Sequence, residues 1–131
     1  MPLTEAQHRL QNAAHKGMAQ QLAILATAPA SAPTQGTFRQ WAQIALFYAA
    51  LHHARATLVA HYGSAPTNHR DTLTALYQHT GGRAAPHWSG YVAYKRLFDR
   101  SRATRYNAYE PTYLELQRDE NDLRTVEQHI L

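Results

Sequence analysis

The feature that most constrains the fold is residues 37–62, a long stretch that contains neither glycine nor proline. Alanine and other strong helix formers fill it, and apolar side chains recur at steps of three and four residues, which predicts one long helix. Thr37 and Gln40 have the spacing of a capping box at its start, and Gly63 can end it in the left-handed conformation. Because the stretch is apolar on several sides, other helices have to cover it.

Four further segments have the periodicity of amphipathic helices, namely residues 4–28, 68–79, 89–104 and 111–130. Proline and glycine separate them in residues 27–36 and 80–87, which we expect to be connections. The chain contains no strand pattern and no internal repeat. The sequence therefore predicts a single all-α domain over residues 1–131, an up-and-down bundle of four long helices and one short helix.

The core is expected where the apolar stripes of these helices meet. In the first helix the stripe that we expect to face inward consists of Leu10, Ala14, Met18, Leu22 and Leu25. Across the bundle, the expected core positions are Trp41, Ile44, Tyr48, Leu51, Leu58, Leu97 and Leu123. The last helix opens with a second capping box, formed by Thr112 and Glu115.

The composition excludes several classes of function. The chain has no cysteine, which excludes disulfides, thiol catalysis and cysteine-based zinc sites. Its histidines pair at helical spacings without acidic neighbours, so we expect neither a metal site nor a cofactor. No run of 18 apolar residues and no leader pattern occur, which favours a cytoplasmic protein that does not enter a membrane.

The net charge of +4 is unevenly distributed along the chain. Residues 82–106 contain a single acid, Asp99, and six basic residues, which are Arg83, Lys95, Arg96, Arg100, Arg102 and Arg105. Residues 107–131 instead contain most of the acidic residues. The basic block predicts a surface for a phosphate-bearing partner, although a solvated helix face or neutralisation by the acidic last helix would also explain it.

Several segments resemble HEPN domains, helical domains named for nucleotide binding in higher eukaryotes and prokaryotes. Residues 47–58, Phe-Tyr-Ala-Ala-Leu-His-His-Ala-Arg-Ala-Thr-Leu, are similar to the family's helix Tyr-Tyr-Ala-x-Phe-His-Ala-Ala-Arg-Ala-Leu-Leu. Residues 66–70, Pro-Thr-Asn-His-Arg, resemble its Pro-x-x-His segment, and residues 97–106 resemble its arginine-rich helix end closing on tyrosine. The resemblance, over residues 38–131, implies a compact bundle, a homodimer and action on RNA or a nucleotide.

Many HEPN domains are metal-independent ribonucleases whose catalytic pair is an arginine followed by a histidine after four to six residues. No histidine stands at that spacing after Arg96, Arg100 or Arg102, so the pair is not recognisable in the basic block. Arg100 and Arg102 could instead act with Tyr106, although a phenol with a pKa near 10 is a poor base at neutral pH. A histidine could also reach the site through the fold, the candidates being His52, His53 and His69.

Three functions remain open at this point. The leading interpretation is a HEPN-like domain that binds RNA or a nucleotide through its basic block, in a toxin–antitoxin, phage-defence or CRISPR-associated setting. Bases could stack on tyrosines, for which the candidates are Tyr91, Tyr94, Tyr106 and Tyr109. The alternatives are a metal-independent endoribonuclease with a site around Arg100–Tyr106, and a non-catalytic dimerisation or docking subunit for an antitoxin or a nucleotidyltransferase. Whether the chain is an enzyme is left open.

Overall fold

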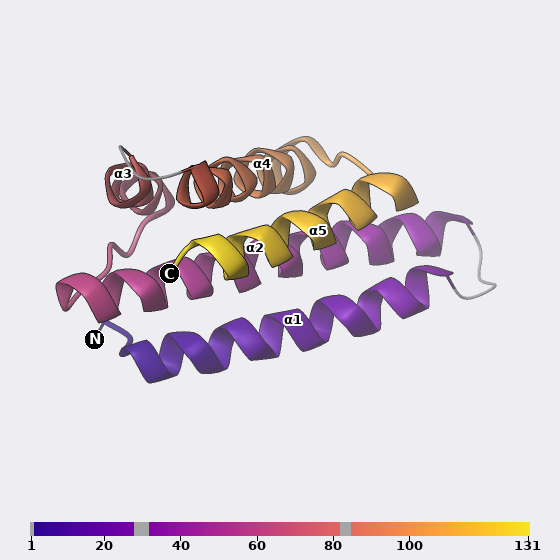
Figure 1. Cartoon of the computed structure of the whole chain (residues 1–131). Helices are drawn as coiled ribbons and strands as arrows, with labels where there is room; N and C mark the ends of the chain where they lie inside the picture. Colours follow the sequence, from indigo (N-terminus) through magenta and orange to yellow (C-terminus); the bar gives the residue numbers. More distant parts are fainter. Residues whose placement is uncertain (1, 28–31, 82–84) are drawn as a thin grey trace.

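The computed structural model describes residues 2–27, 32–81 and 85–131, and within them the chain is helical without any strand (Figure 1). The helices are α1 (Glu5–Thr27), α2 (Ala32–Tyr62), α3 (His69–Thr80), α4 (Ala85–Asn107) and α5 (Tyr113–His129). The predicted all-α bundle and its five helices are confirmed. Within the described ranges, none of these helices is both long and apolar enough to cross a membrane.

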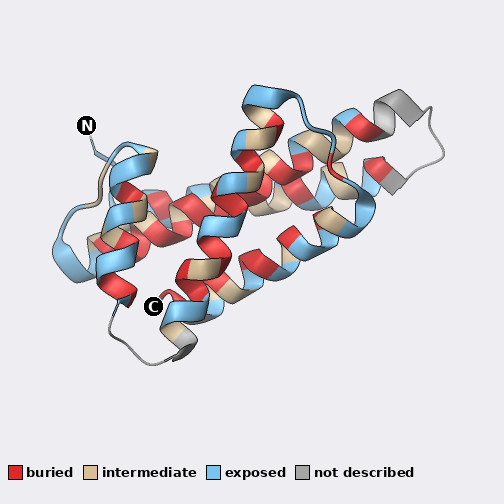
Figure 2. Ribbon diagram, turned by 90° about the horizontal axis from the view of Figure 1, so that it is seen from above, coloured by how far each residue is buried: buried red, intermediate tan, exposed pale blue. Residues whose placement is uncertain are grey.

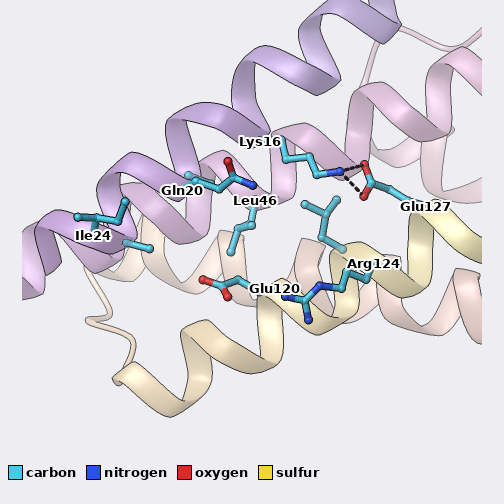
Figure 3. A pocket seen from close by; sticks show the side chains of 10 residues that line it. Lys16, Gln20, Ile24, Leu46, Glu120, Arg124 and Glu127 are labelled. Carbon is cyan, nitrogen blue, oxygen red and sulfur yellow. Dashed lines mark hydrogen bonds and ion pairs between the residues drawn. The ribbon is translucent and has the colours of Figure 1, made fainter. Parts of the chain in front are cut away.

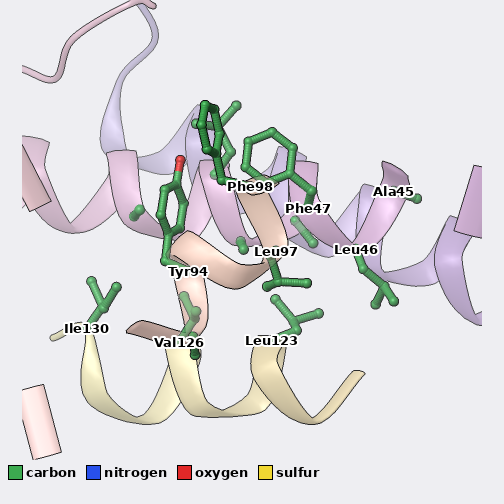
Figure 4. Packing of buried hydrophobic residues seen from close by; sticks show 14 of the residues in the cluster. Ala45, Leu46, Phe47, Tyr94, Leu97, Phe98, Leu123, Val126 and Ile130 are labelled. Carbon is green, nitrogen blue, oxygen red and sulfur yellow. The ribbon is translucent and has the colours of Figure 1, made fainter. Parts of the chain in front are cut away.

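Helix α2 is the centre of the bundle, because it packs against each of the other four helices. In Figure 1, α1 runs along one side of α2, while α3, α4 and α5 lie on its other sides. Figure 2 shows that the buried residues line the inner surfaces of the helices. The largest buried side chains in this core include Phe47, Leu51, Tyr94, Leu97, Val126 and Ile130, several of which are labelled in Figure 4.

The expected core positions are confirmed only in part. Leu51, Leu58, Leu97 and Leu123 are buried, and Ile44 and Tyr48 are half-buried. Trp41 was predicted to be buried, but 58% of its surface is exposed. The physical reason is that small residues make the contacts of α2: its alanines at 42, 45, 49, 50, 54 and 56 are buried against neighbouring helices. Leu46, Phe47, Leu51 and Leu58 are also buried, so large apolar residues mark only part of the inward face of this helix.

The prediction for the inward face of α1 was wrong except at Leu22, which is partly buried against the core. Leu10, Met18 and Leu25 are 70%, 52% and 45% exposed, while the side of α1 that faces α2 carries the buried His8 and Ala19. This interface combines small residues with hydrogen bonds. Asn12 on the same side donates through Nδ2 to the carbonyl oxygen of Ala49 over 2.8 Å. Because these polar groups are bonded inside the interface, α1 turns its most apolar stripe outward.

Two helices begin earlier than the sequence predicted. Helix α2 starts at Ala32, so Thr37 and Gln40 lie inside it and do not form the expected capping box. Helix α4 starts at Ala85 and not at residue 89. In each case a proline, Pro33 or Pro86, falls within the first turn, where a missing N–H is tolerated. The remaining parts of the expected connections, residues 28–31 and 82–84, lie outside the described residues.

Other predicted ends are confirmed. Gly63 has a positive φ of 81°, and its N–H donates to the carbonyl oxygen of Val59 over 2.8 Å, which ends α2. Thr112 and Glu115 form the predicted capping box at the start of α5. Side chains of α2 hold the turn between α4 and α5: Gln40 donates to the carbonyl oxygens of Ala108 and Tyr109 over 3.3 and 3.2 Å.

A histidine pair links α1 to α2 near the start of α1. The Nδ1 atoms of His8 and His52 lie 3.0 Å apart, so one ring donates a hydrogen bond and the other has to accept it unprotonated. The pKa of His52 is lowered to about 4, mainly by burial and in smaller part by the neighbouring His8, His15 and Arg55. The interface between α1 and α2 therefore depends on neutral histidine.

We expect His52 to make the protein sensitive to acid. Below pH 6.5 the unfolded chain takes up a proton on this residue and the folded chain does not, so the free energy of unfolding falls until about pH 4. In His52→Gln the free energy of unfolding should fall less steeply as the pH decreases. The slope should correspond to the uptake of up to one proton fewer on unfolding. The measurement is urea unfolding at a series of pH values.

Asn12→Ala is the matched control, because it removes a neighbouring hydrogen bond between α1 and α2 without removing a titrating group. It should lower stability at every pH and keep the wild-type pH dependence. An unchanged pH dependence in His52→Gln would contradict the role given to the histidine pair.

Candidate nucleic-acid interface

The structure divides the predicted basic block into paired and unpaired cations. Arg96 pairs with Asp122 over 2.7 Å, and Arg100 pairs with Asp119 and Asp122 over 2.6 and 2.8 Å. Helix α5 thus neutralises part of α4, as one of the sequence interpretations held. Lys95 pairs with Asp99 over 3.0 Å on the exposed side of α4, and Arg83 lies outside the described residues.

The pairing of Arg100 continues into a buried polar network that joins three helices. Asp119 is fully buried and accepts a hydrogen bond from Nε2 of Gln43 on α2 over 2.7 Å. The other end of the Gln43 amide accepts a hydrogen bond from the Thr104 hydroxyl of α4. Burial raises the pKa of Asp119, against the opposing effects of Gln43 and Arg100. The network holds Arg100 in a structural position, with its guanidinium committed to two carboxylates and 28% of its side chain exposed.

Two cations of the block remain available. In the part of the chain that the structure describes, neither Arg102 nor Arg105 takes part in an ion pair. They lie on the face of α4 opposite Arg96 and Arg100, because the helix advances by about 100° per residue. This face meets the first turn of α3. The two helices enclose a basic hollow of about 430 Å³, lined by His69, Arg70, Phe98, Arg102, Arg105 and Tyr106.

The local sequence explains why α3 begins at this hollow. Asn68 caps the helix, since its side-chain oxygen accepts the N–H of Asp71 over 2.8 Å. His69 and Arg70 are therefore the first residues of α3, where the helix dipole adds positive potential. The basic hollow combines this helix end with three guanidinium groups, and no carboxylate lines it. An anion is the ligand that such a site favours.

Aromatic rings hold the two free arginines of α4 without cancelling their charge. The guanidinium of Arg105 lies 5.5 Å from the ring centre of Phe47, 5.9 Å from that of Tyr48 and 5.3 Å from that of Tyr106. Its Nε also donates to the carbonyl oxygen of Ser101 over 3.3 Å. Arg102 lies over Phe98 at 5.6 Å. These contacts orient both cations and leave them able to bind an anion.

Of the three candidate histidines, His69 is the one that the fold brings to the free arginines. His52 bonds to His8 in the α1 interface, and His53 is buried with its Nε2 2.8 Å from the carbonyl oxygen of Ile130. The Nδ1 atom of His69 is buried and has no hydrogen-bond partner in the structure. Burial lowers the pKa of His69, and the positive charges of Arg105 and Arg55 lower it further. His69 is therefore neutral at pH 7.

Of the four tyrosines predicted to stack on bases, the fold brings only one to the basic hollow. Tyr106 is 72% exposed and lines the basic hollow, whereas Tyr91 and Tyr94 are buried. Tyr109 is exposed, but its hydroxyl donates to Glu115 over 2.5 Å. Sequence reasoning missed Arg70, although its position beside His69 at the start of a helix is a signal for an anion site. It also missed the exposed Trp41, which was assigned to the core.

A second surface depression lies between α1 and α5 and has a different character (Figure 3). Lys16 and Glu127 form an ion pair of 2.9 Å across it, and Glu120 also lines it. Its two carboxylates balance the charges of Lys16 and Arg124, so this groove has no excess positive charge that would attract a polyanion. Among the described residues, no group of three or more histidine, aspartate or glutamate side chains could hold a metal ion.

Comparison with protein families, curated proteins and solved structures gives no match for this chain. The basic hollow and its residues are therefore the observations from which a function can be inferred.

Proposed function

We propose that the chain is a HEPN-like cytoplasmic domain that binds RNA or a nucleotide, in a toxin–antitoxin, phage-defence or CRISPR-associated setting. The observation that carries this proposal is the basic hollow, where three guanidinium groups and the start of α3 meet around a space without a lining carboxylate. Arg105 lies beside the exposed ring of Tyr106, and this pairing of a cation with an exposed ring favours single-stranded nucleic acid over a purely acidic protein surface. The ligand contacts come from Arg70, Arg102 and Arg105.

We expect a single-stranded RNA oligomer to bind with an affinity that falls as salt rises. For single strands each phosphate contact contributes a slope of about 0.7 to the dependence of log affinity on log salt. The double variant Arg102→Ala/Arg105→Ala should therefore bind more weakly and lose about 1.4 from this slope. Fluorescence anisotropy of a labelled oligomer at a series of salt concentrations measures both quantities.

The double variant Arg118→Ala/Arg124→Ala is the control, because it removes the same number of charges from exposed positions of α5. It should keep the wild-type slope. Wild-type protein without salt-dependent binding, or an equal loss in the control, would contradict the proposal and favour the docking subunit.

A second candidate function is a metal-independent ribonuclease, and the position of His69 favours it. A neutral imidazole beside guanidinium groups can accept the proton of a 2′-hydroxyl, while the arginines stabilise the charge that develops on the phosphate. The 2′-oxygen would then form a bond to phosphorus as the bond to the 5′-oxygen breaks. The products are a 2′,3′-cyclic phosphate and a 5′-hydroxyl, whose oxygen takes a proton from water, and the imidazolium then releases its proton to solvent. Tyr106, which lines the same hollow, is a poorer candidate than His69 for the proton acceptor, because a phenol is a weak base at neutral pH.

If the hollow is catalytic, wild-type protein will cleave a long RNA in the presence of a metal chelator and leave cyclic phosphate ends. His69→Ala should then slow cleavage by about 10² to 10⁴, the usual contribution of a positioned proton acceptor. His61→Ala, at an exposed histidine far along α2, should cleave as wild type. Equal cleavage by the His69 and His61 variants would exclude this mechanism, and Tyr106→Phe would then test the tyrosine.

We also propose that the chain forms a homodimer through the outer face of α1. That face carries Leu10 and Ile24, which are 70% and 68% exposed and stand seven residues before and after Gly17. A Cβ added at Gly17 would meet no atom within 4 Å, so packing within the chain does not require this glycine. A glycine inside a helix costs about 0.5–1 kcal/mol relative to alanine. Two α1 helices crossing antiparallel at Gly17 would place each Leu10 near the Ile24 of the other copy.

The charges of α1 agree with this arrangement, because they point away from the outer face. Glu5 pairs with Arg9, Arg9 reaches His53 over 3.4 Å, and Lys16 binds Glu127. Two copies can therefore meet without repulsion between like charges.

Sedimentation at micromolar concentration should give twice the chain mass of 14.8 kDa. Gly17→Gln adds a side chain to the proposed crossing point and should shift the protein to monomer without loss of fold stability. Leu114→Gln changes an exposed leucine of α5 and should leave the dimer intact. A wild-type monomer would overturn the dimer and leave the face of α1 for an antitoxin or other protein partner.

A further inference from the structure

We propose that Trp41 forms a stacking site for one nucleobase of a single strand, beside the basic hollow. The inference rests on the proposed nucleic-acid binding, and it adds where the base binds and how it is recognised. Its basis is an aromatic hollow of about 440 Å³ between α2 and the end of α4, which is lined by Gln40, Trp41, Ile44, Tyr48, Thr104, Arg105 and Ala108.

Arg105 connects the aromatic hollow to the basic hollow, because its side chain lines both. Its Nη1 donates to the Tyr48 hydroxyl over 3.4 Å, and Tyr48 lines the aromatic hollow. A phosphate in the basic hollow and a base in the aromatic hollow would therefore contact the same guanidinium. Phosphate and base are neighbours in every nucleotide, so one strand can fill both hollows.

The exposure of Trp41 is unusual for its position in the chain. The residues next to it on α2, Ala42 and Gln43, are buried, yet 58% of the Trp41 surface is exposed. The other tryptophan, Trp88, is 39% exposed and stacks on Tyr91 with ring centres 5.1 Å apart. Across the described chain, Trp41 has no such ring contact. An exposed indole that makes no ring contact within the described chain is available for a base to stack on.

The residues that line the aromatic hollow also indicate how a base is recognised. The amide of Gln40 is engaged by the turn at Ala108, and the Thr104 hydroxyl donates into the buried network at Gln43. The hollow therefore offers aromatic rings and a guanidinium to a ligand, because these two polar side chains already have hydrogen-bond partners. Recognition by stacking accepts any base, and it requires a base that is not paired in a duplex.

The test uses Trp88→Phe, in which Trp41 is the one tryptophan and reports on its own site. A uridine oligomer should quench its fluorescence, whereas an abasic ribose-phosphate oligomer of equal length should bind more weakly and not quench it. Trp41→Ala should lower the affinity for the uridine oligomer by about 5-fold to 100-fold, the usual range for base–aromatic stacking, and leave the abasic affinity unchanged. Trp41→Phe should retain most of the affinity for the uridine oligomer.

The possible failures are distinguishable. If both oligomers bind equally well and Trp41 fluorescence does not change, the stacking site is wrong and the proposed phosphate binding stands. If neither oligomer binds at low salt, the proposed function fails and the stacking site fails with it. A Trp41→Ala protein that binds both oligomers as wild type, with unchanged thermal unfolding, would also overturn the stacking site.

Discussion

The candidate site depends on the ion pairs that join α4 to α5. Asp122 of α5 pairs with both Arg96 and Arg100, and the fully buried Asp119 of α5 binds Arg100 as well. Removing Arg100 would leave the carboxylate of Asp119 buried without its charged partner, which typically costs about 3–5 kcal/mol, so this pair fixes how α4 is turned about its axis. Once one face of α4 is committed to α5, Arg102 and Arg105 on the opposite face have to point towards α3.

This division of the basic helix gives its two halves different tasks. The paired arginines hold three helices together through Asp119 and Gln43, and carboxylates within the fold neutralise their charges. The free arginines lie against aromatic rings, which orient a cation without neutralising it. A ligand that reaches the basic hollow therefore meets cations whose positions are already set, which lowers the cost of ordering them on binding.

The sequence determined the helices and the general location of charge. Uninterrupted helix formers, the glycine at position 63 and the capping box at Thr112 are local signals, and local hydrogen bonding and backbone freedom act on them in the same way in any surroundings. The sequence also located the basic block at residues 82–106, because charge can be counted without knowing the fold. It named His69 among three candidate histidines and could not choose between them.

The tertiary structure decided which side of each helix faces inward and which charges remain free. Alanines and bonded histidines form the contact between α1 and α2, so the apolar stripe of Leu10 and the indole of Trp41 are exposed. Hydrophobic periodicity could not show this, because it reports only where apolar residues recur. The contacts between these helices depend instead on close packing and on paired polar groups. The meeting of His69 with Arg102 and Arg105 also joins residues distant in sequence. Only the rotation of α4, set by the carboxylates of α5, brings them to one hollow.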